Sequence, residues 1–370
     1  MKILYITNIP SPYRIDFYNK LSESAELTVL FEARRAKGIT FNWNDDLSKF
    51  TSIFLKDGDI EEKKIDWKIL KYIKKRKYDL FVATNYSYHT ELIAYLKMIF
   101  RRIPFVLEID GVVAQEENFI KRSFKKFLLT KPRAYFSPSK NSDDILSKYG
   151  CKRENIYRYP FTSLGEKDVL KSPLSDEEKR AYKAKIGIPD NKTVLYVGRF
   201  IELKMIDILL KSMEGWAEKH TLVLVGGTAD SEYMQQFKAY ISDNVYITGF
   251  KTKEELFDYY GAADIFVLPT RSDVWGLVIN EAMAFGLPVI STDKCGAALE
   301  LIENGYNGYI VPVGDTEALA KSINDIFADE AGLAEYGKNS LKKIKAHTIE
   351  EMVRCHMKSF EEIIWKNCGK

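Results

Sequence analysis

Short runs of β-branched and other apolar residues alternate with amphipathic helical stretches along nearly the whole chain. This alternation constrains the fold strongly, because strands that are apolar on both faces need helices on both sides of a parallel sheet. Six strands are predicted in each half, at 2–7, 27–33, 79–84, 104–109, 134–139 and 155–160, then at 193–198, 221–226, 245–249, 265–270, 288–292 and 308–313. The pattern predicts an α/β protein with two doubly wound parallel sheets.

The chain has 370 residues, a length typical of two domains. A polar stretch between the halves, residues 163–192, is interrupted by glycines and prolines and contains one helix start, where Ser175 and Glu178 have capping-box spacing. We predict an N-terminal domain at 1–165, a linker at 166–192, a C-terminal domain at 193–346, and a last helix at 347–370 that packs locally or crosses back to the first domain.

Composition excludes several classes of protein. With 46% hydrophobic and 29% charged residues the chain resembles an average globular protein, and no apolar run approaches the roughly 18 residues of a membrane span. The N-terminus has the pattern of a first strand and lacks the small-residue cleavage site of a signal peptide. The four cysteines are far apart, as is typical of reduced thiols. These features predict a cytoplasmic protein.

The net charge of +3 conceals an asymmetry. Residues 1–170 contain 31 Lys and Arg against 22 Asp and Glu, a balance of +9, whereas residues 171–370 contain 24 against 30, a balance of −6. A basic half can attract nucleic acid, an anionic membrane or a charged substrate, and charge alone does not choose between them.

The strongest constellation follows the predicted strand 265–270. A helix that begins near Gly276 directs the free amides of Leu277 and Val278, and its positive dipole end, toward any anion beyond the strand. Glu281 lies four residues after Leu277 on the same helix face, where a carboxylate can accept hydrogen bonds from the hydroxyls of a ribose. The alternative interpretation is an ordinary turn with a solvated glutamate.

A second candidate follows the strand 193–198. Gly198 lets the backbone approach a ligand, and Arg199 and Lys204 are two cations at the strand end. Fixed cations can neutralise a diphosphate leaving group in place of a metal. Taken alone, these two side chains are better explained as solvated surface charges.

The order of these motifs resembles a known family. V-G-R-x-x-x-x-K, then V-G-G, then F-V-L-P-T-x-x-D-x-W-G-L-V-x-x-E-A-M-A-x-G-L-P-V-I is similar to family 4 of the retaining glycosyltransferases, within glycosyl transferases group 1. The resemblance is strong over about 190–345 and covers the first half by pattern only. It implies the GT-B fold, in which two Rossmann-like domains face a central cleft.

The resemblance also implies roles for particular residues. Arg199 and Lys204 match the family's pair on the donor diphosphate, and Leu277 and Val278 match its phosphate-binding amides. Glu281 matches the second acid of the E-x7-E motif, which usually contacts the ribose. Asp273 replaces the usual first glutamate, which contacts the transferred sugar, and is one methylene shorter. The turn that contains Gly249, Phe250 and Lys251 matches the segment that meets the nucleobase.

In the N-terminal half, Glu108 and Asp110 end the strand 104–109. Residues two apart on a strand share a face, so both carboxylates are candidates for one site. Asp110 resembles the His or Asp that the family has near the reacting sugar, where a carboxylate orients the acceptor or stabilises positive charge. A routine Asp-Gly turn is the competing interpretation. Tyr13 and Arg14, in the first turn, are predicted to meet the acceptor or a phosphate, or else to pack the first helix.

No metal or other cofactor is predicted. Asp57-Gly58-Asp59 resembles a D-x-D metal motif, but it lies in a charged run and is interpreted as a turn. His89, His220, His347 and His356 show no metal-ligand spacing and no acidic partner. A dinucleotide fingerprint is missing after every predicted strand, which disfavours an oxidoreductase.

The stretch Phe119 to Lys131 combines apolar residues at helical spacing with Lys121, Arg122, Lys125 and Lys126. Basic amphipathic helices often lie on anionic membranes, although the same pattern describes a helix packed on a core. With the basic N-terminal half, it favours peripheral contact with the inner face of the plasma membrane and a lipid-linked acceptor.

These observations predict a metal-independent, retaining glycosyltransferase that moves a sugar from a nucleoside-diphosphate sugar to a glycan or lipid-linked acceptor in cell-surface polysaccharide or glycolipid synthesis. The alternatives are a nucleotide-sugar epimerase, a sucrose-type synthase with a soluble acceptor, a nucleotide-sugar binder without transfer activity, and a nucleic-acid binder. We favour no nucleic-acid partner.

Overall fold

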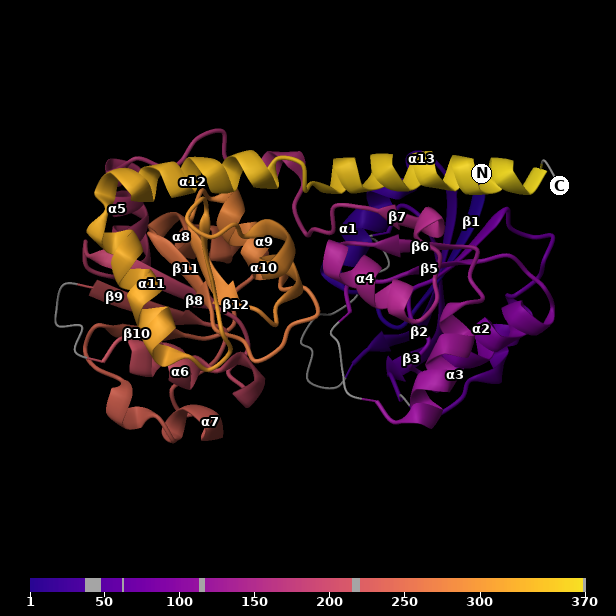
Figure 1. Cartoon of the computed structure of the whole chain (residues 1–370), viewed down its shortest axis with the longest axis horizontal. Helices are drawn as coiled ribbons and strands as arrows, with labels where there is room; N and C mark the ends of the chain where they lie inside the picture. Colours follow the sequence, from indigo (N-terminus) through magenta and orange to yellow (C-terminus); the bar gives the residue numbers. More distant parts are fainter. Residues whose placement is uncertain (37–47, 62, 113–116, 215–219, 369–370) are drawn as a thin grey trace. The chain divides into compact units, whose positions relative to one another are not determined.

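A computed structural model describes residues 1–36, 48–61, 63–112, 117–214 and 220–368. The chain divides into two compact units (Figure 1). Unit 1 consists of Met1–Ser163 together with Thr348–Lys370, and unit 2 consists of Leu164–His347. The segment 166–192, interpreted from sequence as a linker, lies within unit 2, and the last helix groups with unit 1.

Unit 1 is built on a seven-stranded parallel sheet in the order β3-β2-β1-β4-β5-β6-β7. Its strands are β1 (Lys2–Thr7), β2 (Glu26–Arg35), β3 (Thr51–Asp59), β4 (Leu80–Ala83), β5 (Val106–Glu108), β6 (Ala134–Ser137) and β7 (Ile156–Arg158). Its helices are α1 (Pro12–Leu21), α2 (His89–Phe100), α3 (Phe119–Leu129), α4 (Lys140–Lys148) and α13 (Ile349–Cys368), with 3-10 turns η2 (Trp67–Lys71) and η3 (Arg153–Asn155). The strand order reverses between β1 and β4, and ligands of open α/β sheets bind at such a switch point.

Unit 2 contains a six-stranded parallel sheet in the order β10-β9-β8-β11-β12-β13. Its strands are β8 (Lys192–Val197), β9 (His220–Val225), β10 (Val245–Thr248), β11 (Ile265–Leu268), β12 (Val289–Thr292) and β13 (Gly308–Val311). Its helices are α5 (Asp176–Ile186), α6 (Ile206–Ser212), α7 (Glu232–Gln235), α8 (Lys253–Ala262), α9 (Leu277–Ala284), α10 (Gly296–Leu301), α11 (Thr316–Ala328) and α12 (Glu330–Ile344), with 3-10 turns η4 (Glu166–Asp168), η5 (Glu202–Lys204) and η6 (Lys238–Tyr240). The prediction of an α/β protein with two parallel sheets is therefore confirmed.

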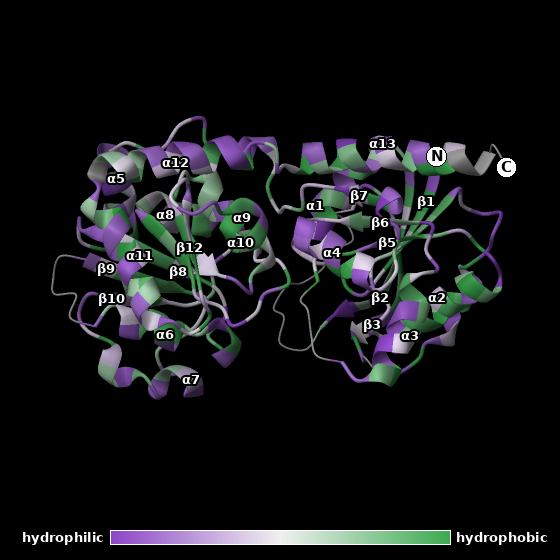
Figure 2. Cartoon of the chain, in the orientation of Figure 1, coloured by the Kyte–Doolittle hydropathy of each residue, from purple (hydrophilic) through white to green (hydrophobic). Residues whose placement is uncertain are grey.

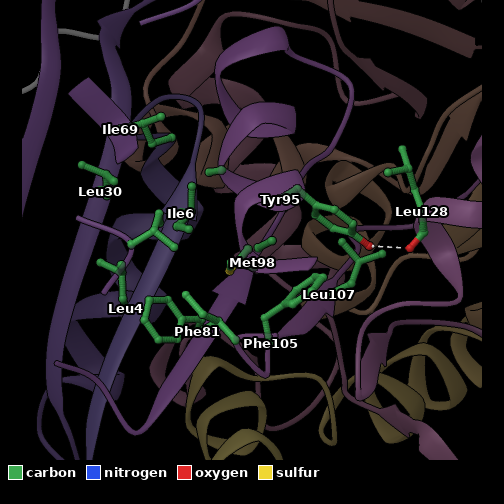
Figure 3. Packing of buried hydrophobic residues seen from close by; sticks show 14 of the residues in the cluster. Leu4, Ile6, Leu30, Ile69, Phe81, Tyr95, Met98, Phe105, Leu107 and Leu128 are labelled. Atoms are coloured by element: carbon green, nitrogen blue, oxygen red, sulfur yellow. Dashed lines mark hydrogen bonds between the residues drawn. The ribbon is translucent and has the colours of Figure 1, made fainter. Parts of the chain in front are cut away.

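The central strands are buried on both faces, which explains their continuous apolar sequences. In unit 1, Leu4, Phe81 and Leu107 come from three neighbouring strands and pack in one hydrophobic core (Figure 3). Tyr95 of α2 joins this core, and its hydroxyl donates a hydrogen bond to the Leu128 carbonyl oxygen at 3.1 Å. In unit 2, β11 is apolar throughout (Figure 2), and all residues of β11 and β12 and all but the first of β8 are buried.

Of two local predictions from the sequence, the structure confirms one and contradicts the other. The capping box is confirmed: Ser175 accepts a hydrogen bond from the Glu178 amide, and the Glu178 carboxylate accepts one from the Ser175 amide. The turn predicted at Asp57-Gly58-Asp59 is wrong, because these residues end the edge strand β3. This strand was missed because it is charged and only half-buried, as edge strands commonly are.

Candidate functional site

The turn between β11 and α9 directs the start of α9 as the sequence predicts. Gly276 caps the helix with φ near +100°, in the left-handed region. A Cβ atom there would lie 2.9 Å from the Cys295 Sγ, so both the backbone angle and the packing favour glycine. Leu277 and Val278 are the first two helical residues, and their amides precede the first intrahelical hydrogen bond. The helix therefore begins with amide donors available to an anion.

Lys204 and Asp273 form an ion pair, with Nζ and Oδ2 2.5 Å apart. Both side chains are largely buried, with 14% and 20% of their surfaces exposed. Two contacts to the Leu203 carbonyl oxygen tie their turns together: the Thr270 hydroxyl donates at 3.1 Å, and the Arg271 amide donates at 2.8 Å. The structure thus brings two predicted site residues together, and Thr270 is a supporting residue that sequence reasoning missed.

Gly198 and Arg199 follow β8 directly. The Gly198 amide donates to the Val225 carbonyl oxygen at 2.9 Å, and the Tyr196 hydroxyl donates to the Arg199 carbonyl oxygen at 3.0 Å. The backbone of this turn is therefore held from two sides. The Arg199 side chain is exposed, and within the described ranges no ion pair of its guanidinium is found. This cation keeps its donors available for a ligand.

Glu281 is held by a residue that the sequence did not single out. The Tyr260 hydroxyl, on α8, donates a hydrogen bond to the Glu281 Oε2 at 2.8 Å. Burial and the neighbouring carboxylate raise the pKa of Tyr260 well above its ordinary value, so this hydroxyl remains a donor at neutral pH. This bond fixes the position of the Glu281 carboxylate.

The turn after β10 carries the remaining candidates of unit 2. Gly249 is followed by Phe250, which is 77% exposed. Lys251 pairs with Glu255 at 3.8 Å, and its ammonium lies 5.8 Å from the centre of the Tyr259 ring. The residues expected to meet a nucleobase therefore lie at the surface of unit 2, and the aromatic side chain is free to stack.

In unit 1 the four predicted residues form one cluster. Arg14, which is 3% exposed, forms ion pairs with Glu108 and with Asp110. The Tyr13 hydroxyl donates to the other oxygen of Asp110 at 3.0 Å. The two carboxylates thus point to the same side, although a glycine follows Asp110. Arg14 is therefore buried, and its guanidinium bridges the carboxylates of Glu108 and Asp110.

His356 completes this cluster, and the prediction that it has no acidic partner is wrong. It lies on α13, fully buried, with Nε2 3.2 Å from the Glu108 Oε2 and Nδ1 2.7 Å from the Met352 carbonyl oxygen. Its ring stacks on Phe136, with the centroids 4.5 Å apart. Sequence alone could not supply this contact, because the two partners are 248 residues apart.

The two acids of unit 1 have opposite pKa shifts. Burial acts to raise the pKa of Glu108, but Arg14, His356 and hydrogen bonds outweigh it and lower the pKa to about 2. Burial raises the pKa of Asp110 above its ordinary value; Arg14 opposes this change and the Glu108 carboxylate reinforces it. Glu108 is therefore a fixed anion, while Asp110 is the acid that holds a proton more readily.

Among the described residues, no cluster of three or more His, Cys, Asp or Glu side chains could hold a metal ion. Asp57 instead pairs with Arg34 at 2.9 Å, and Asp59 pairs with Arg35 at 3.7 Å.

Comparison with known proteins finds a family match in unit 2. Residues 178–343 match the model of the family "Glycosyl transferases group 1". The match lies entirely within unit 2. An uncharacterized glycosyltransferase of Methanocaldococcus jannaschii is 31% identical over 46% of this chain and 44% of its own length. The capsular polysaccharide biosynthesis glycosyltransferase CapM of Staphylococcus aureus is 31% identical over 42% of each chain. The chain spans about half the length of the first curated relatives it matches.

Solved structures of other proteins show the fold over the whole chain. A sucrose-phosphate synthase of Thermosynechococcus elongatus aligns with a TM-score of 0.76 over 99% of this chain and 100% of its own, at 20% identity. Anabaena Alr3699/HepE, in complex with UDP and glucose, aligns with a TM-score of 0.76 over 98% and 99% of the two chains, at 19% identity. The protein has the GT-B fold. Across the helices that the structure describes, none has both the length and the apolar character of a membrane span.

Proposed function

We propose that the protein is a retaining, metal-independent glycosyltransferase that moves a sugar from a UDP- or GDP-linked donor to an acceptor hydroxyl. The observation that carries this proposal is the grouping, in one group 1 domain, of an exposed Arg199, the Lys204–Asp273 pair and the first amides of α9. These groups suit an anion that gains charge as a glycosidic bond breaks.

The donor site follows from the same contacts. Arg199 and the α9 amides bind the diphosphate, and Lys204 turns toward it from Asp273, whose carboxylate then meets the transferred sugar. Glu281, anchored by Tyr260, accepts hydrogen bonds from the ribose, and the exposed Phe250 stacks on the base. Fixed cations and amides replace a metal in this scheme.

Retention of configuration is assigned to front-face attack. The glycosidic bond breaks, the acceptor oxygen bonds to the anomeric carbon from the same side, and a phosphate oxygen of the leaving diphosphate takes the acceptor proton. Arg199 and Lys204 stabilise the negative charge on the diphosphate, and the Asp110 carboxylate stabilises positive charge on the sugar ring.

The test measures nucleotide release from UDP- and GDP-sugars, with and without glycan acceptors, in the presence of EDTA. Lys204→Ala and Glu281→Ala are each expected to lower turnover at least about a hundredfold, as the loss of one preorganised contact does. Lys211→Ala, which removes a surface lysine of α6 paired with Asp207, is the matched control and keeps full activity. Full activity in either site variant, or inhibition by EDTA, contradicts the proposal; a new sugar still attached to its nucleotide indicates an epimerase.

We further propose that the acceptor is lipid-linked and that α3 contacts an anionic membrane at the inner face of the plasma membrane. The alternative, an apolar face packed on the core, agrees poorly with the burial: within α3 only Leu128 and Leu129 are buried. Phe119 and Ile120 are 82% and 79% exposed, and Phe124 is 50% exposed. Apolar and polar residues alternate along α3 in Figure 2.

Charge complementarity supports this membrane contact. Lys121, Arg122 and Lys126 lie on the same helix and are all exposed, and each cation near an anionic surface contributes about 1 kcal/mol. Flotation with phosphatidylglycerol vesicles is expected to recover the protein, whereas phosphatidylcholine vesicles are not. Phe119→Ser combined with Ile120→Ser is expected to abolish recovery. Absence of flotation with anionic vesicles refutes this part of the proposal without affecting the donor site.

A further inference from the structure

Unit 1 contains a pocket that none of the roles above uses. Its volume is about 360 Å³, within the range of small-molecule sites. It is bounded by the ends of β2 and β3, by the segment that leads into η2, and by the first turn of α2. All of its described lining residues belong to unit 1, so the pocket is complete without unit 2.

The rim of the pocket carries charges that are already paired with one another. Lys56 is hydrogen-bonded to Glu61, and Lys64 lies 3.6 Å from the same carboxylate. Lys68 lies 4.0 Å from Asp66, whose side chain also caps η2 by accepting from the Lys68 amide. A charged ligand would have to break these pairs, whereas a neutral polar ligand can use their remaining donors and acceptors.

The inner wall carries a buried acid with unsatisfied hydrogen-bonding capacity. Glu32, at the end of β2, lines the pocket and is 6% exposed, and its Oε2 has no hydrogen-bond partner among the residues described. Glu91 lies close enough to interact with it electrostatically, and neither of its carboxyl oxygens has a partner within the described part of the chain. Of these two acids only Glu32 lines the pocket. Buried polar groups are normally hydrogen-bonded, so the orphaned oxygen of Glu32 points to a ligand that donates.

The environment of these acids disfavours added negative charge. Burial raises the pKa of Glu32, and Asp66 adds to this shift while a hydrogen bond with Thr90 opposes it. Burial raises the pKa of Glu91 more strongly, and Glu32 adds to that shift. A carboxyl oxygen accepts hydrogen bonds from hydroxyl groups, so the inner wall suits an alcohol better than a phosphate.

Trp67 lines the same pocket and is 61% exposed. The face of an indole offers a flat apolar surface, and the C–H face of a sugar ring can lie against it while its hydroxyls reach polar groups around the edge. Large exposed aromatic side chains that border a cavity are more typical of a binding site than of a bare surface. Ile60 and Ile65 extend this apolar wall.

We propose that this pocket is a binding subsite for a neutral saccharide, with Trp67 as the stacking surface and Glu32 as the hydrogen-bonding group at its inner end. The inference rests on the proposed function only in the identity of the saccharide, which we assign to the acceptor glycan. Saccharide binding in this pocket requires neither a bound nucleotide sugar nor the residues of unit 2, because the described lining residues all belong to unit 1.

The experiment titrates the full-length protein with glucose, galactose, mannose and N-acetylglucosamine, with binding followed by saturation-transfer NMR. At least one of these sugars is expected to bind, and glucosamine and glucose 6-phosphate are expected to bind no better. Hexanol tests whether apolar contact alone suffices. Binding by none of the neutral sugars overturns the proposal, as does tighter binding of either charged sugar or equal binding of hexanol.

Variants locate the binding. Trp67→Ala is expected to weaken sugar affinity at least about tenfold, as loss of an aromatic anchor does, while Trp67→Phe retains a stacking surface and stays within about threefold. Trp365→Ala removes another exposed tryptophan of unit 1, on α13, and leaves affinity unchanged. Glu32→Gln keeps a neutral hydrogen-bonding group and retains binding, whereas Glu32→Leu loses it.

The outcome is separable from that of the proposed function. UDP affinity, measured by calorimetry on the same variants, is expected to stay at the wild-type value, because Trp67 and Glu32 belong to unit 1. Unchanged sugar affinity in Trp67→Ala and Glu32→Leu refutes the subsite even if nucleotide release is normal. Sugar binding that depends on Trp67, in a protein that releases no nucleotide, would refute the enzyme and keep the subsite.

Discussion

Replacing Glu108 with glutamine tests the charge network of unit 1, because glutamine imitates the protonated acid without changing its shape. The pKa of Glu108 falls from 4.5 to about 2 on folding, since Arg14 and His356 outweigh the effect of burial. At about 1.4 kcal/mol per unit, the ionised carboxylate contributes on the order of 3 kcal/mol to the stability of unit 1 at pH 7. The side chain is fully buried, so solvent screens little of this contribution.

The sign of the pH dependence follows from the lowered pKa. The contribution is fully present above the unfolded value of 4.5 and is lost as the pH falls toward 2. Glu108→Gln is therefore expected to lower the free energy of unfolding by about 3 kcal/mol at pH 7 and by only about 1.4 kcal/mol at pH 3. Hydrogen exchange of the β1 and β5 amides in urea reports this free energy for unit 1.

Glu26→Gln is the matched control, because Glu26 also lies in the sheet of unit 1 but is exposed and pairs with Lys2 at 3.3 Å. Its effect is expected to stay within about 0.5 kcal/mol at any pH. A Glu108→Gln deficit that is the same at pH 3 and pH 7 would refute the electrostatic argument, because a packing defect does not titrate. A deficit below about 1 kcal/mol at pH 7 would refute the magnitude.

Three further substitutions or reactions test the packing of unit 2. Tyr260→Phe removes the donor to Glu281 and is expected to weaken UDP binding about fivefold in calorimetry and to destabilise unit 2 by about 1 kcal/mol. Gly308→Ala places a Cβ 1.8 Å from a backbone oxygen of β12 and is expected to destabilise unit 2 by about 3 kcal/mol or more, whereas Gly305→Ala, whose Cβ meets nothing within 4 Å, changes the melt far less. Burial raises the pKa of Cys295 to about 12, so iodoacetamide at pH 8 is expected to leave it unmodified until the protein unfolds; labelling of the native protein, seen by mass spectrometry, would contradict this.

The order of strands and helices could be read from the sequence because each central strand is apolar on both faces. Residues 79–84 and 265–270 needed no tertiary information, and the structure places β4 and β11 within them. The edge strand β3 was not predicted, because an edge strand is half-exposed and its charged residues, such as Asp57, resemble those of a loop. Periodicity reports burial, so it fails where a strand has little of it.

In the candidate sites, likewise, local sequence could select some residues but not the contacts between them. Lys204 and Asp273 could be selected because each follows a strand, but their 2.5 Å contact joins residues 69 apart and depends on the packing of two turns. Tyr260 and His356 gave no signal, since a tyrosine on an amphipathic helix and an isolated histidine have no distinctive spacing. Partners that meet only through the fold are not encoded in any local pattern.

Glu108 and Asp110 share Arg14 as an ion-pair partner but differ in their protonation. Glu108 is fully buried and is held by Arg14, His356 and the Tyr5 hydroxyl, whereas 28% of the Asp110 side chain is exposed and its pKa is raised above the ordinary 3.8. Environments that push two carboxyl pKa values apart assign the fixed anion and the titrating group. If the Asp110 carboxylate stabilises the sugar cation, kcat/KM falls as the pH drops, and the midpoint of that fall lies above 3.8. A profile with its acid limb below 3.8, or the same limb in the residual activity of Asp110→Asn, would show that Asp110 does not perform this role.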